Sequence, residues 1–346
     1  MITSLFLVAF IITLVATAAC RWLGLVDQPD ERKRHVGSIP LSGGIAVFIS
    51  IVVSTFALNV PPYTTEMLTI AILVFALGVF DDFQHTNPWL RLSMQYGAGI
   101  ALATYGGIAI HNVGNLLMLG DIPLLMLAVP LTALAVAGLS NAYNMIDGID
   151  GLSAALMLIP LAVLSALAYS MGHPMLNSLL LMVVPLIVFL IFNLGPNTKS
   201  LPKIFLGDGG SITMGFLITA SLVYFSQGDS TLINPVTALW LVTVPLMDML
   251  ATMARRHRNG RKLMEADRSH LHYSLIDLGL SPRVALLVMV VYAVGCALLG
   301  LLLESFPDYV SMFSFFGLFI VHLVFIATVS RALDAKAMQT ESIKTA

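Results

Sequence analysis

The segment L-T-A-L-A-V-A-G-L-S-N-A-Y-N-M-I-D-G-I-D-G-L-S-A-A-L-M-L-I-P-L-A-V, residues 131–163, places a short polar stretch between two apolar runs. Within residues 141–152 the chain gathers two Asn, two Asp and two Gly. The flanking runs, residues 122–140 and 152–171, are long enough to cross a bilayer as helices. The segment therefore predicts two membrane-spanning helices that are joined by a polar connection at the membrane edge.

The composition of the whole chain points the same way. Of its 346 residues, 58% are hydrophobic and only 10% are charged, whereas soluble domains carry about 25% charged residues. We therefore predict an all-α polytopic integral membrane protein. Cys20 and Cys296 each lie in an apolar run, which indicates neither a disulfide framework nor a cysteine metal site. No basic residue precedes Arg21, so the first run is typical of a retained span and not of a cleaved signal peptide.

Eleven apolar runs of spanning length predict eleven transmembrane helices. Their expected positions are 2–20, 43–60, 64–80, 92–110, 122–140, 152–171, 175–192, 211–227, 233–254, 284–303 and 309–329. All 17 Lys and Arg residues fall in odd-numbered gaps between these runs or after the last run. The positive-inside rule then places these gaps and the C-terminus in the cytoplasm and the N-terminus in the periplasm. We expect one membrane-embedded domain over residues 1–330 and a mobile cytoplasmic tail over residues 331–346.

Three clusters of acidic and amide side chains end up on the predicted cytoplasmic face. They are the Asp81-Asp82 pair, the 141–152 stretch, and F-L-G-D-G-G-S at residues 205–211. Asp and Asn often cap helices, so each cluster alone has a structural explanation. Because all three lie at one membrane edge, we favour a functional site that meets both a soluble substrate and a lipid substrate.

The polar side chains of the 141–152 stretch recur every third residue. On a regular helix the neighbours in such a series meet while its ends diverge. Gly148 and Gly151 indicate that the helix breaks there, which would let the series converge on one point. The four residues concerned are Asn141, Asn144, Asp147 and Asp150.

Asp208 lies among glycines that allow a ligand to approach the backbone closely. Mg²⁺ is commonly held by one or two carboxylates together with substrate phosphates, so Asp208 with a nearby Asn or Asp fits a Mg²⁺-phosphate site. The chain has no P-loop motif. The alternative is a glycine-rich turn in which Asp208 only caps a helix.

The fifth cytoplasmic loop, residues 255–273, is rich in Arg, Lys and His. Arg suits phosphate binding, and a basic loop also suits an anionic lipid surface. His270 and His272 are too close in sequence to share one helical face, and no further ligands complete a zinc site. Asp248 lies inside the ninth run, where a carboxylate marks either a function or a structural pairing with a loop cation. Both interpretations of Asp248 remain open.

Taken in order, these motifs resemble the polyprenyl-phosphate N-acetylhexosamine-1-phosphate transferase family over residues 24–283. The family implies transfer of GlcNAc-1-phosphate from UDP-GlcNAc to undecaprenyl phosphate, which yields undecaprenyl-pyrophosphoryl-GlcNAc and UMP. It also implies Mg²⁺ or Mn²⁺ as cofactor, an active site that faces the cytoplasm at the bacterial inner membrane, and initiation of O-antigen or a related surface glycan. The motifs are G-L-V-D-Q-P-D-E-R-K-R-H…I-P-L-S-G-G (24–44), Asp81-Asp82, N-A-Y-N-M-I-D-G-I-D-G-L (141–152), F-L-G-D-G-G-S (205–211), N-P-V-T-A-L-W…P-L-M-D-M (234–249) and D-R-S-H-L-H (267–272).

The resemblance also implies a role for each matching residue. Asp208 and Asn144 would hold the metal. The catalytic carboxylates would be Asp81 and Asp82 at the acceptor phosphate and Asp147 and Asp150 at the nucleotide. The substrate-binding residues would be Arg91, Asn141, Arg268, His270 and His272.

Two positions depart from the family pattern. His85 stands where many relatives have a third acid, and Tyr273 stands where many have a further His. These departures leave another UDP-N-acetylhexosamine donor open. A membrane transporter is the rival class of function, although the polar groups gather at one membrane edge and not at the midplane. The sequence leaves the oligomeric state open, a homodimer included, as well as a one-step or an aspartyl-phosphate mechanism. It indicates no nucleic-acid partner.

Overall fold

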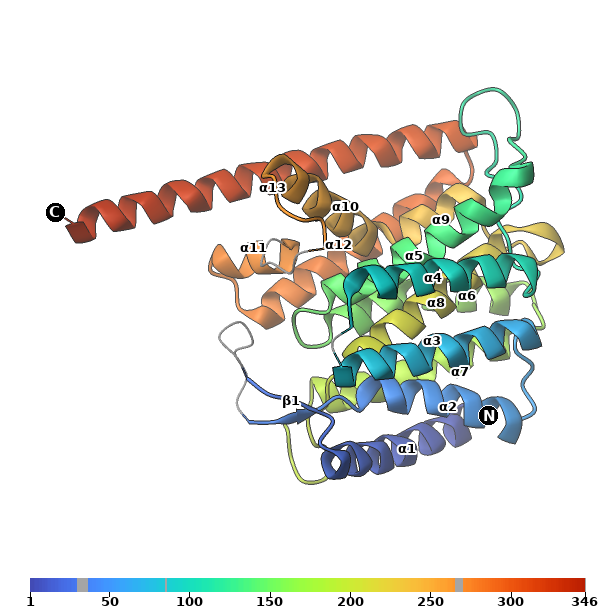
Figure 1. The fold of residues 1–346 in the computed structure, drawn as a ribbon. Helices are drawn as coiled ribbons and strands as arrows, with labels where there is room; N and C mark the ends of the chain where they lie inside the picture. Colours follow the sequence, from blue (N-terminus) through green and yellow to red (C-terminus); the bar gives the residue numbers. More distant parts are fainter. Residues whose placement is uncertain (30–36, 85, 265–269, 346) are drawn as a thin grey trace.

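A computed structural model describes residues 1–29, 37–84, 86–264 and 270–345. Figure 1 shows long helices that lie side by side in one bundle, with the N-terminus at one end and a short hairpin and α11 at the other. In chain order the helices are α1 Ile2–Leu23, α2 Gly43–Ala57, α3 Thr65–Gln84, α4 Pro88–Thr104, α5 Ala128–Ile146, α6 Leu152–Ser170, α7 Leu176–Asn193, α8 Gly207–Ser226, α9 Pro235–Leu241, α10 Thr243–Arg258, α11 Leu271–Asp277, α12 Pro282–Leu303 and α13 Asp308–Thr345. The hairpin pairs β1 Val26–Asp27 with β2 Ile39–Pro40 in antiparallel fashion.

Each of the eleven predicted runs overlaps at least one of these helices. Within the described residues, seven helices are long and apolar enough to cross a membrane, and an eighth span results if α9 and α10 count as one. Helix α2 is a shorter apolar helix. The chain is therefore an all-α, multi-pass membrane protein, while the count of eleven spans and their orientation stay predictions.

The ninth predicted run is broken where the sequence suggested one continuous helix. Helices α9 and α10 meet at an angle of 78°. Pro245 accounts for the break, because proline has no N–H to donate to the carbonyl of Leu241 and its ring clashes with that carbonyl. At the C-terminus, α13 extends to Thr345, so the backbone of the predicted tail is helical over residues 331–345.

Helix α8 lies at the centre of the bundle, packed against α2, α3, α5 and α6. Over an 18-residue apolar stretch of this helix, 94% is buried inside the protein. Its glycine-rich start lets two neighbouring backbones approach closely. A Cβ atom built on Gly44 of α2 would lie 2.1 Å from the Gly210 Cα, and one built on Gly78 of α3 would lie 2.7 Å from the Gly209 Cα. Small residues of this kind let membrane helices pack backbone to backbone, and here they clamp the first turn of α8.

Two backbone hydrogen bonds extend this clamp beyond the helices. The N–H groups of Gly43 and Gly44 donate to the carbonyls of Phe205 and Leu206, each at 2.8 Å. The start of α2 and the residues just before α8 therefore hold each other in place, which fixes the backbone that carries Asp208.

This packing predicts that Gly44→Ala destabilises the protein. The added methyl group has no space against Gly210, and overpacking of this kind costs about 1–3 kcal/mol. The measurement is the midpoint of thermal unfolding in detergent at a fixed scan rate. Gly97→Ala on α4 is the matched control, because nothing lies within 4 Å of a Cβ built on Gly97. Equal midpoints for the two variants would contradict the close contact.

Candidate active site

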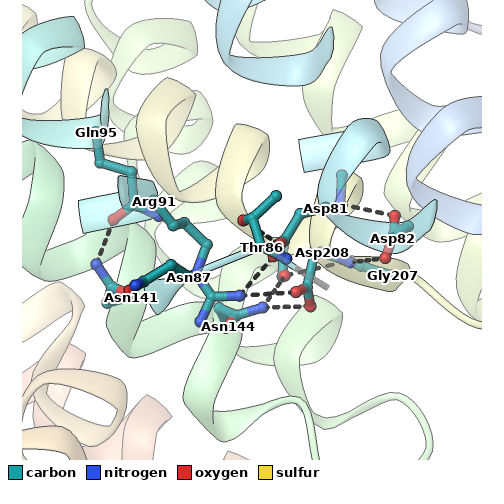
Figure 2. Close-up of polar contacts among 12 residues, drawn as sticks. Asp81, Asp82, Thr86, Asn87, Arg91, Gln95, Asn141, Asn144, Gly207 and Asp208 are labelled. Carbon is teal, nitrogen blue, oxygen red and sulfur yellow. Dashed lines mark hydrogen bonds and ion pairs between the residues drawn. The ribbon is translucent and has the colours of Figure 1, made fainter. Parts of the chain in front are cut away.

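The carboxylate of Asp82 caps the start of α8. It accepts a hydrogen bond from the Asp208 N–H at 2.7 Å and another from the Gly209 N–H at 3.0 Å. The first N–H groups of a helix have no partner within the helix, and the helix dipole favours a negative charge beside them. Both oxygens of Asp82 are thus engaged in fixing the first turn of α8 against the end of α3 (Figure 2).

Gly207 makes this cap possible in two ways. Its φ of +73° is a left-handed backbone conformation that favours glycine. A Cβ atom at this position would also lie 2.8 Å from the Asp82 Oδ2 atom. Gly207, the first glycine of the F-L-G-D-G-G-S motif, is therefore explained by the turn and by the carboxylate that approaches it.

Arg91 bridges two carboxylates that lie far apart in the sequence. Its Nη1 atom lies 2.6 Å from the Asp81 Oδ2 atom and 2.9 Å from the Asp208 Oδ2 atom. The other Asp81 oxygen accepts the Thr86 N–H at 2.7 Å and contacts the Thr86 hydroxyl. Asp81 is buried, whereas 35% of the Asp208 side chain is exposed. Asp208 is therefore the carboxylate of this group that a soluble ligand can reach.

The sequence around Arg91 explains its placement. Asn87 caps α4 by accepting the Trp89 N–H at 2.9 Å, and Pro88 occupies the first helical position. The helix therefore begins three residues before Arg91, which lies in its first turn and points toward Asp81 and Asp208.

Asn144 brings the third cluster into the same place. Its Nδ2 atom donates to the Asp208 Oδ1 atom at 2.7 Å and to the Ser211 Oγ atom at 3.0 Å. Figure 2 shows Asp81, Arg91, Asn144 and Asp208 converging from α3, α4, α5 and α8. One residue of each predicted cluster therefore lies at this point of the bundle, whereas only Asn144 of the series from Asn141 to Asp150 joins the network around Asp208 among the described residues.

The convergence of carboxylates gives this end of the bundle a negative character. Burial, together with the charge of Asp208, raises the pKa of Asp82 to about 7, although the two N–H groups that it accepts oppose the rise. Among the described residues, no group of three or more His, Cys, Asp or Glu side chains is arranged to hold a metal ion unaided. A cation bound here would complete its coordination with an amide oxygen, water or oxygens of a substrate.

Asp147 and Asp150 lie at the open edge of the site. Asp150 forms an ion pair with Lys203 at 2.5 Å, and 43% of its side chain is exposed. Lys203 in turn lies over the Phe205 ring, 5.8 Å from its centroid. Asp147 follows the end of α5 with an exposed side chain. Neither carboxylate joins the hydrogen-bond network around Asp208 in the part of the chain that the structure describes.

Asp248 is paired with the fifth loop. Its Oδ2 atom lies 2.8 Å from the His270 Nδ1 atom, and its Oδ1 atom accepts the Leu271 N–H at 2.7 Å. Asp248 is only 1% exposed. Of the two interpretations left open by the sequence, the structure shows the pairing, with a histidine as the partner.

His272 connects the fifth loop to the 141–152 stretch. Its ring stacks on that of His270 with 5.6 Å between centroids. A Cβ atom on Gly148 would lie 2.2 Å from the His272 Nε2 atom, so glycine is needed for this contact. Both histidines are buried, and their substrate-binding roles stay predictions. Arg268 and His85 lie outside the described residues.

Asn141 is buried and contacts a residue that the sequence did not single out. Its Nδ2 atom donates to the Gln95 Oε1 atom and, at 2.7 Å, to the Ala137 carbonyl. Gln95 is only 3% exposed. The sequence did offer a signal for Gln95, because its amide side chain lies inside the apolar run of residues 92–110. Polar groups inside a membrane span are costly and often have a function.

Comparisons with known proteins show the family to which the chain belongs. The family described as glycosyl transferase family 4 matches residues 64–226, which include Asp81, Asn144 and Asp208. The chain is 33% identical to the undecaprenyl-phosphate alpha-N-acetylglucosaminyl 1-phosphate transferase of Yersinia pestis, covering 92% of this chain and 88% of that protein. It is 34% identical to the protein of the same name from Haemophilus influenzae, over 94% of this chain and 92% of the relative.

A third relative gives the same result. The probable undecaprenyl-phosphate N-acetylglucosaminyl 1-phosphate transferase of Bacillus subtilis is 32% identical, over 97% of this chain and 92% of the relative. Similarity at this level extends across nearly the whole chain, beyond the motifs alone. The chain therefore belongs to glycosyl transferase family 4 and, within it, to the polyprenyl-phosphate N-acetylhexosamine-1-phosphate transferases.

Proposed function

We propose that the protein transfers GlcNAc-1-phosphate from UDP-GlcNAc to undecaprenyl phosphate and thereby begins an O-antigen or related surface glycan. An oxygen of the lipid phosphate attacks the β-phosphorus of the nucleotide sugar. The bond from that phosphorus to the bridging oxygen breaks, and UMP leaves. The names of the relatives support the two substrates. The single structural observation that carries the proposal is the bridging of Asp81 and Asp208 by Arg91 beside Asn144.

This geometry suits a reaction between two anions. Catalysis of such a transfer is mainly positioning and neutralisation of charge. Arg91 supplies a fixed positive charge and has donors beyond the Nη1 atom that contacts the carboxylates. A phosphate monoester has a second pKa of about 6, so the acceptor phosphate is largely ionised at neutral pH. Asp81, which is held by Thr86 and Arg91, needs to give little help as a base.

The site fits a divalent cation, Mg²⁺ or Mn²⁺. Asp208 offers a carboxylate that is partly open to water, and Asn144 lies within hydrogen-bond distance of it. A half-turn of the Asn144 amide would present its oxygen in place of its N–H. Mg²⁺ typically takes one or two carboxylates and completes its shell with water and substrate phosphates. When bound, the ion would neutralise charge on the donor pyrophosphate.

The remaining carboxylates divide into two groups. We assign Asp82 a positioning role, because both of its oxygens hold the first turn of α8 and so fix Asp208. Asp147 and Asp150, at the open edge, are assigned to the nucleotide end of the donor. The basic residues of the odd-numbered gaps support a cytoplasmic active site at the bacterial inner membrane, where UDP-sugars are available.

Asp208→Asn should abolish activity, because the amide cannot supply the negative charge that a divalent cation requires. Purified protein, undecaprenyl phosphate, Mg²⁺ and a panel of UDP-N-acetylhexosamines are scored for UMP release in detergent, where no gradient can drive transport. We expect UDP-GlcNAc to be the best donor and the variant to lose at least about 100-fold in rate.

Asp229→Asn is the matched control, since Asp229 is an exposed acid of η2 Gly228–Ser230, after the far end of α8. Near-normal turnover by Asp208→Asn would remove Asp208 from the metal role. A different best donor would change the sugar but keep the reaction. If none of the donors in the panel yields UMP, the proposed transferase activity is refuted.

Asp82→Ala should lower thermal stability more than Asp82→Asn does. The alanine leaves two helix N–H groups without their acceptor, and loss of a cap of this kind costs about 1–2 kcal/mol. Asparagine keeps one acceptor oxygen. The midpoint of unfolding is read together with the rate of UMP release. If Asp82 instead contacts only substrate, both variants will keep the wild-type midpoint.

Removal of the metal should be visible without catalysis. Because an ion that binds only the folded state stabilises it by mass action, added Mg²⁺ should raise the unfolding midpoint of the EDTA-treated protein. The rise should disappear in Asp208→Asn and persist in Asp229→Asn. An identical Mg²⁺ response in all three proteins would place the ion elsewhere.

A further inference from the structure

Asp248 is a buried carboxylate that stands apart from the network around Asp208. It lies on α10, three residues after Pro245, inside the ninth apolar run of the sequence. Only 1% of its surface is exposed. A carboxylate in such a place is costly and usually has a function or a buried partner. Its two oxygens have different partners, so two roles can be separated.

One oxygen of Asp248 caps α11. The Leu271 N–H, the first of that helix, donates to the Asp248 Oδ1 atom at 2.7 Å. The first N–H groups of a helix have no partner within the helix, so this hydrogen bond stabilises the start of α11. A cap of this kind needs only an acceptor oxygen, and asparagine caps helices as well as aspartate does. Capping alone therefore does not require a carboxylate at this position.

The other oxygen of Asp248 acts on the ring of His270. The His270 Nδ1 atom lies 2.8 Å from the Asp248 Oδ2 atom and 3.4 Å from the Thr252 hydroxyl oxygen. An ionised carboxylate only accepts hydrogen bonds, so the ring nitrogen beside it has to carry a hydrogen. The partner of one ring nitrogen thereby sets the state of the other. A ligand of His270 would then meet the ring at its Nε2 atom.

The fifth loop carries this influence toward the site. The rings of His270 and His272 differ in plane by only 4°, with 5.6 Å between their centroids. His272 lies so close to Gly148 that a Cβ atom there would be 2.2 Å from the His272 Nε2 atom. Gly148 directly follows Asp147, which we assign to the nucleotide end of the donor. Stacked rings therefore connect the Asp248–His270 pair to the part of the site assigned to the donor.

We infer that Asp248 is a positioning residue of the transferase, which holds a hydrogen on the Nδ1 atom of His270 so that the ring meets the nucleotide-sugar donor through Nε2. This inference rests on the proposed function. Asp248 is too deeply buried to touch the donor itself. It acts through His270, because a ring that is held at Nδ1 keeps both its orientation and the hydrogen-bonding character of Nε2. Supporting hydrogen bonds of this kind hold substrate-binding groups in a productive geometry.

The first test separates the Michaelis constants of the two substrates. Asp248→Asn keeps an oxygen for the Leu271 N–H but turns an N–H group toward the His270 Nδ1 atom, which then has to accept. KM for UDP-GlcNAc should rise about tenfold or more, while KM for undecaprenyl phosphate stays within about twofold. If Asp248 only capped α11, the asparagine would keep both constants. An unchanged KM for the donor, or an equal rise in both constants, would overturn the inference.

Asp308→Asn is the matched control. Asp308 also accepts a backbone N–H, that of Asn115 at 2.9 Å. It begins α13 at the end of the bundle away from α11 (Figure 1). This variant should therefore leave both Michaelis constants at their wild-type values.

A second variant covers the case in which Asp248→Asn fails to fold. The amide N–H of His270→Asn can replace Nδ1 as the donor to Asp248, so the buried carboxylate keeps a partner, and asparagine suits the N-cap position of α11. Nothing replaces Nε2. KM for UDP-GlcNAc should again rise about tenfold. A wild-type KM for the donor in this variant would show that His270 only pairs with Asp248, and the inference would be wrong.

Nuclear magnetic resonance of protein labelled with ¹⁵N-histidine tests the pair without turnover. The signals of His270 are those that His270→Asn lacks. At about pH 8, where an ordinary histidine is neutral, the His270 Nδ1 atom should carry a hydrogen in the wild type and lose it in Asp248→Asn. An Nδ1 atom without hydrogen in the wild type, or one that keeps it in the variant, would contradict the proposed role.

The same spectra separate this inference from the proposed function. Saturating UDP-GlcNAc, added without undecaprenyl phosphate, should shift the His270 Nε2 signal, and the absence of a shift would overturn the inference. If the shift occurs but no UDP-sugar yields UMP, the transferase is refuted while the role of the Asp248–His270 pair in binding the nucleotide sugar stands.

Discussion

The site depends on the capping of α8 by Asp82. Two backbone N–H groups at the start of a central, buried helix need an acceptor, and Asp82 on α3 provides both of its oxygens. The contact fixes Asp208 on α8 relative to Asp81, which precedes Asp82 on α3. With α8 held, Arg91 from α4 and Asn144 from α5 can reach the same carboxylate. The acceptor that the first N–H groups of α8 require therefore also holds the Asp208 carboxylate in position.

The glycines make that support rigid. Gly44 and Gly78 let two helices touch the backbone of α8 at Gly210 and Gly209, so the first turn has little freedom to shift. The position of this turn also matches the substrates. It lies where the bundle ends, so the Asp208 carboxylate is partly exposed, and an apolar-walled pocket between α3, α4 and α8 adjoins Arg91. This placement supports the proposal that a soluble donor and a lipid acceptor react at this carboxylate.

Much of this could be predicted from the sequence, because its strongest signals are local or compositional. Apolar runs indicated the helices, and the Asn87-Pro88 pair is an ordinary helix start. The three polar clusters at one membrane edge indicated that Asp81, Asn144 and Asp208 meet. The capping role of Asp82 was out of reach, because it depends on the φ of Gly207 and on a backbone donor 126 residues away. The pairing of Gln95 with Asn141 likewise requires the relative rotation of α4 and α5, which no local pattern specifies. The break before Pro245 had a local signal, yet the apolar run concealed it.

The most direct test is a cryo-electron microscopy map of the protein with UDP-GlcNAc and Mn²⁺. The account predicts a cation peak on a carboxylate oxygen of Asp208, with the Asn144 oxygen or the donor pyrophosphate completing its shell and with Asp81 and Arg91 beside it. A cation bound away from Asp208, or Asp81 and Asp208 separated at opposite faces of the membrane, would contradict it.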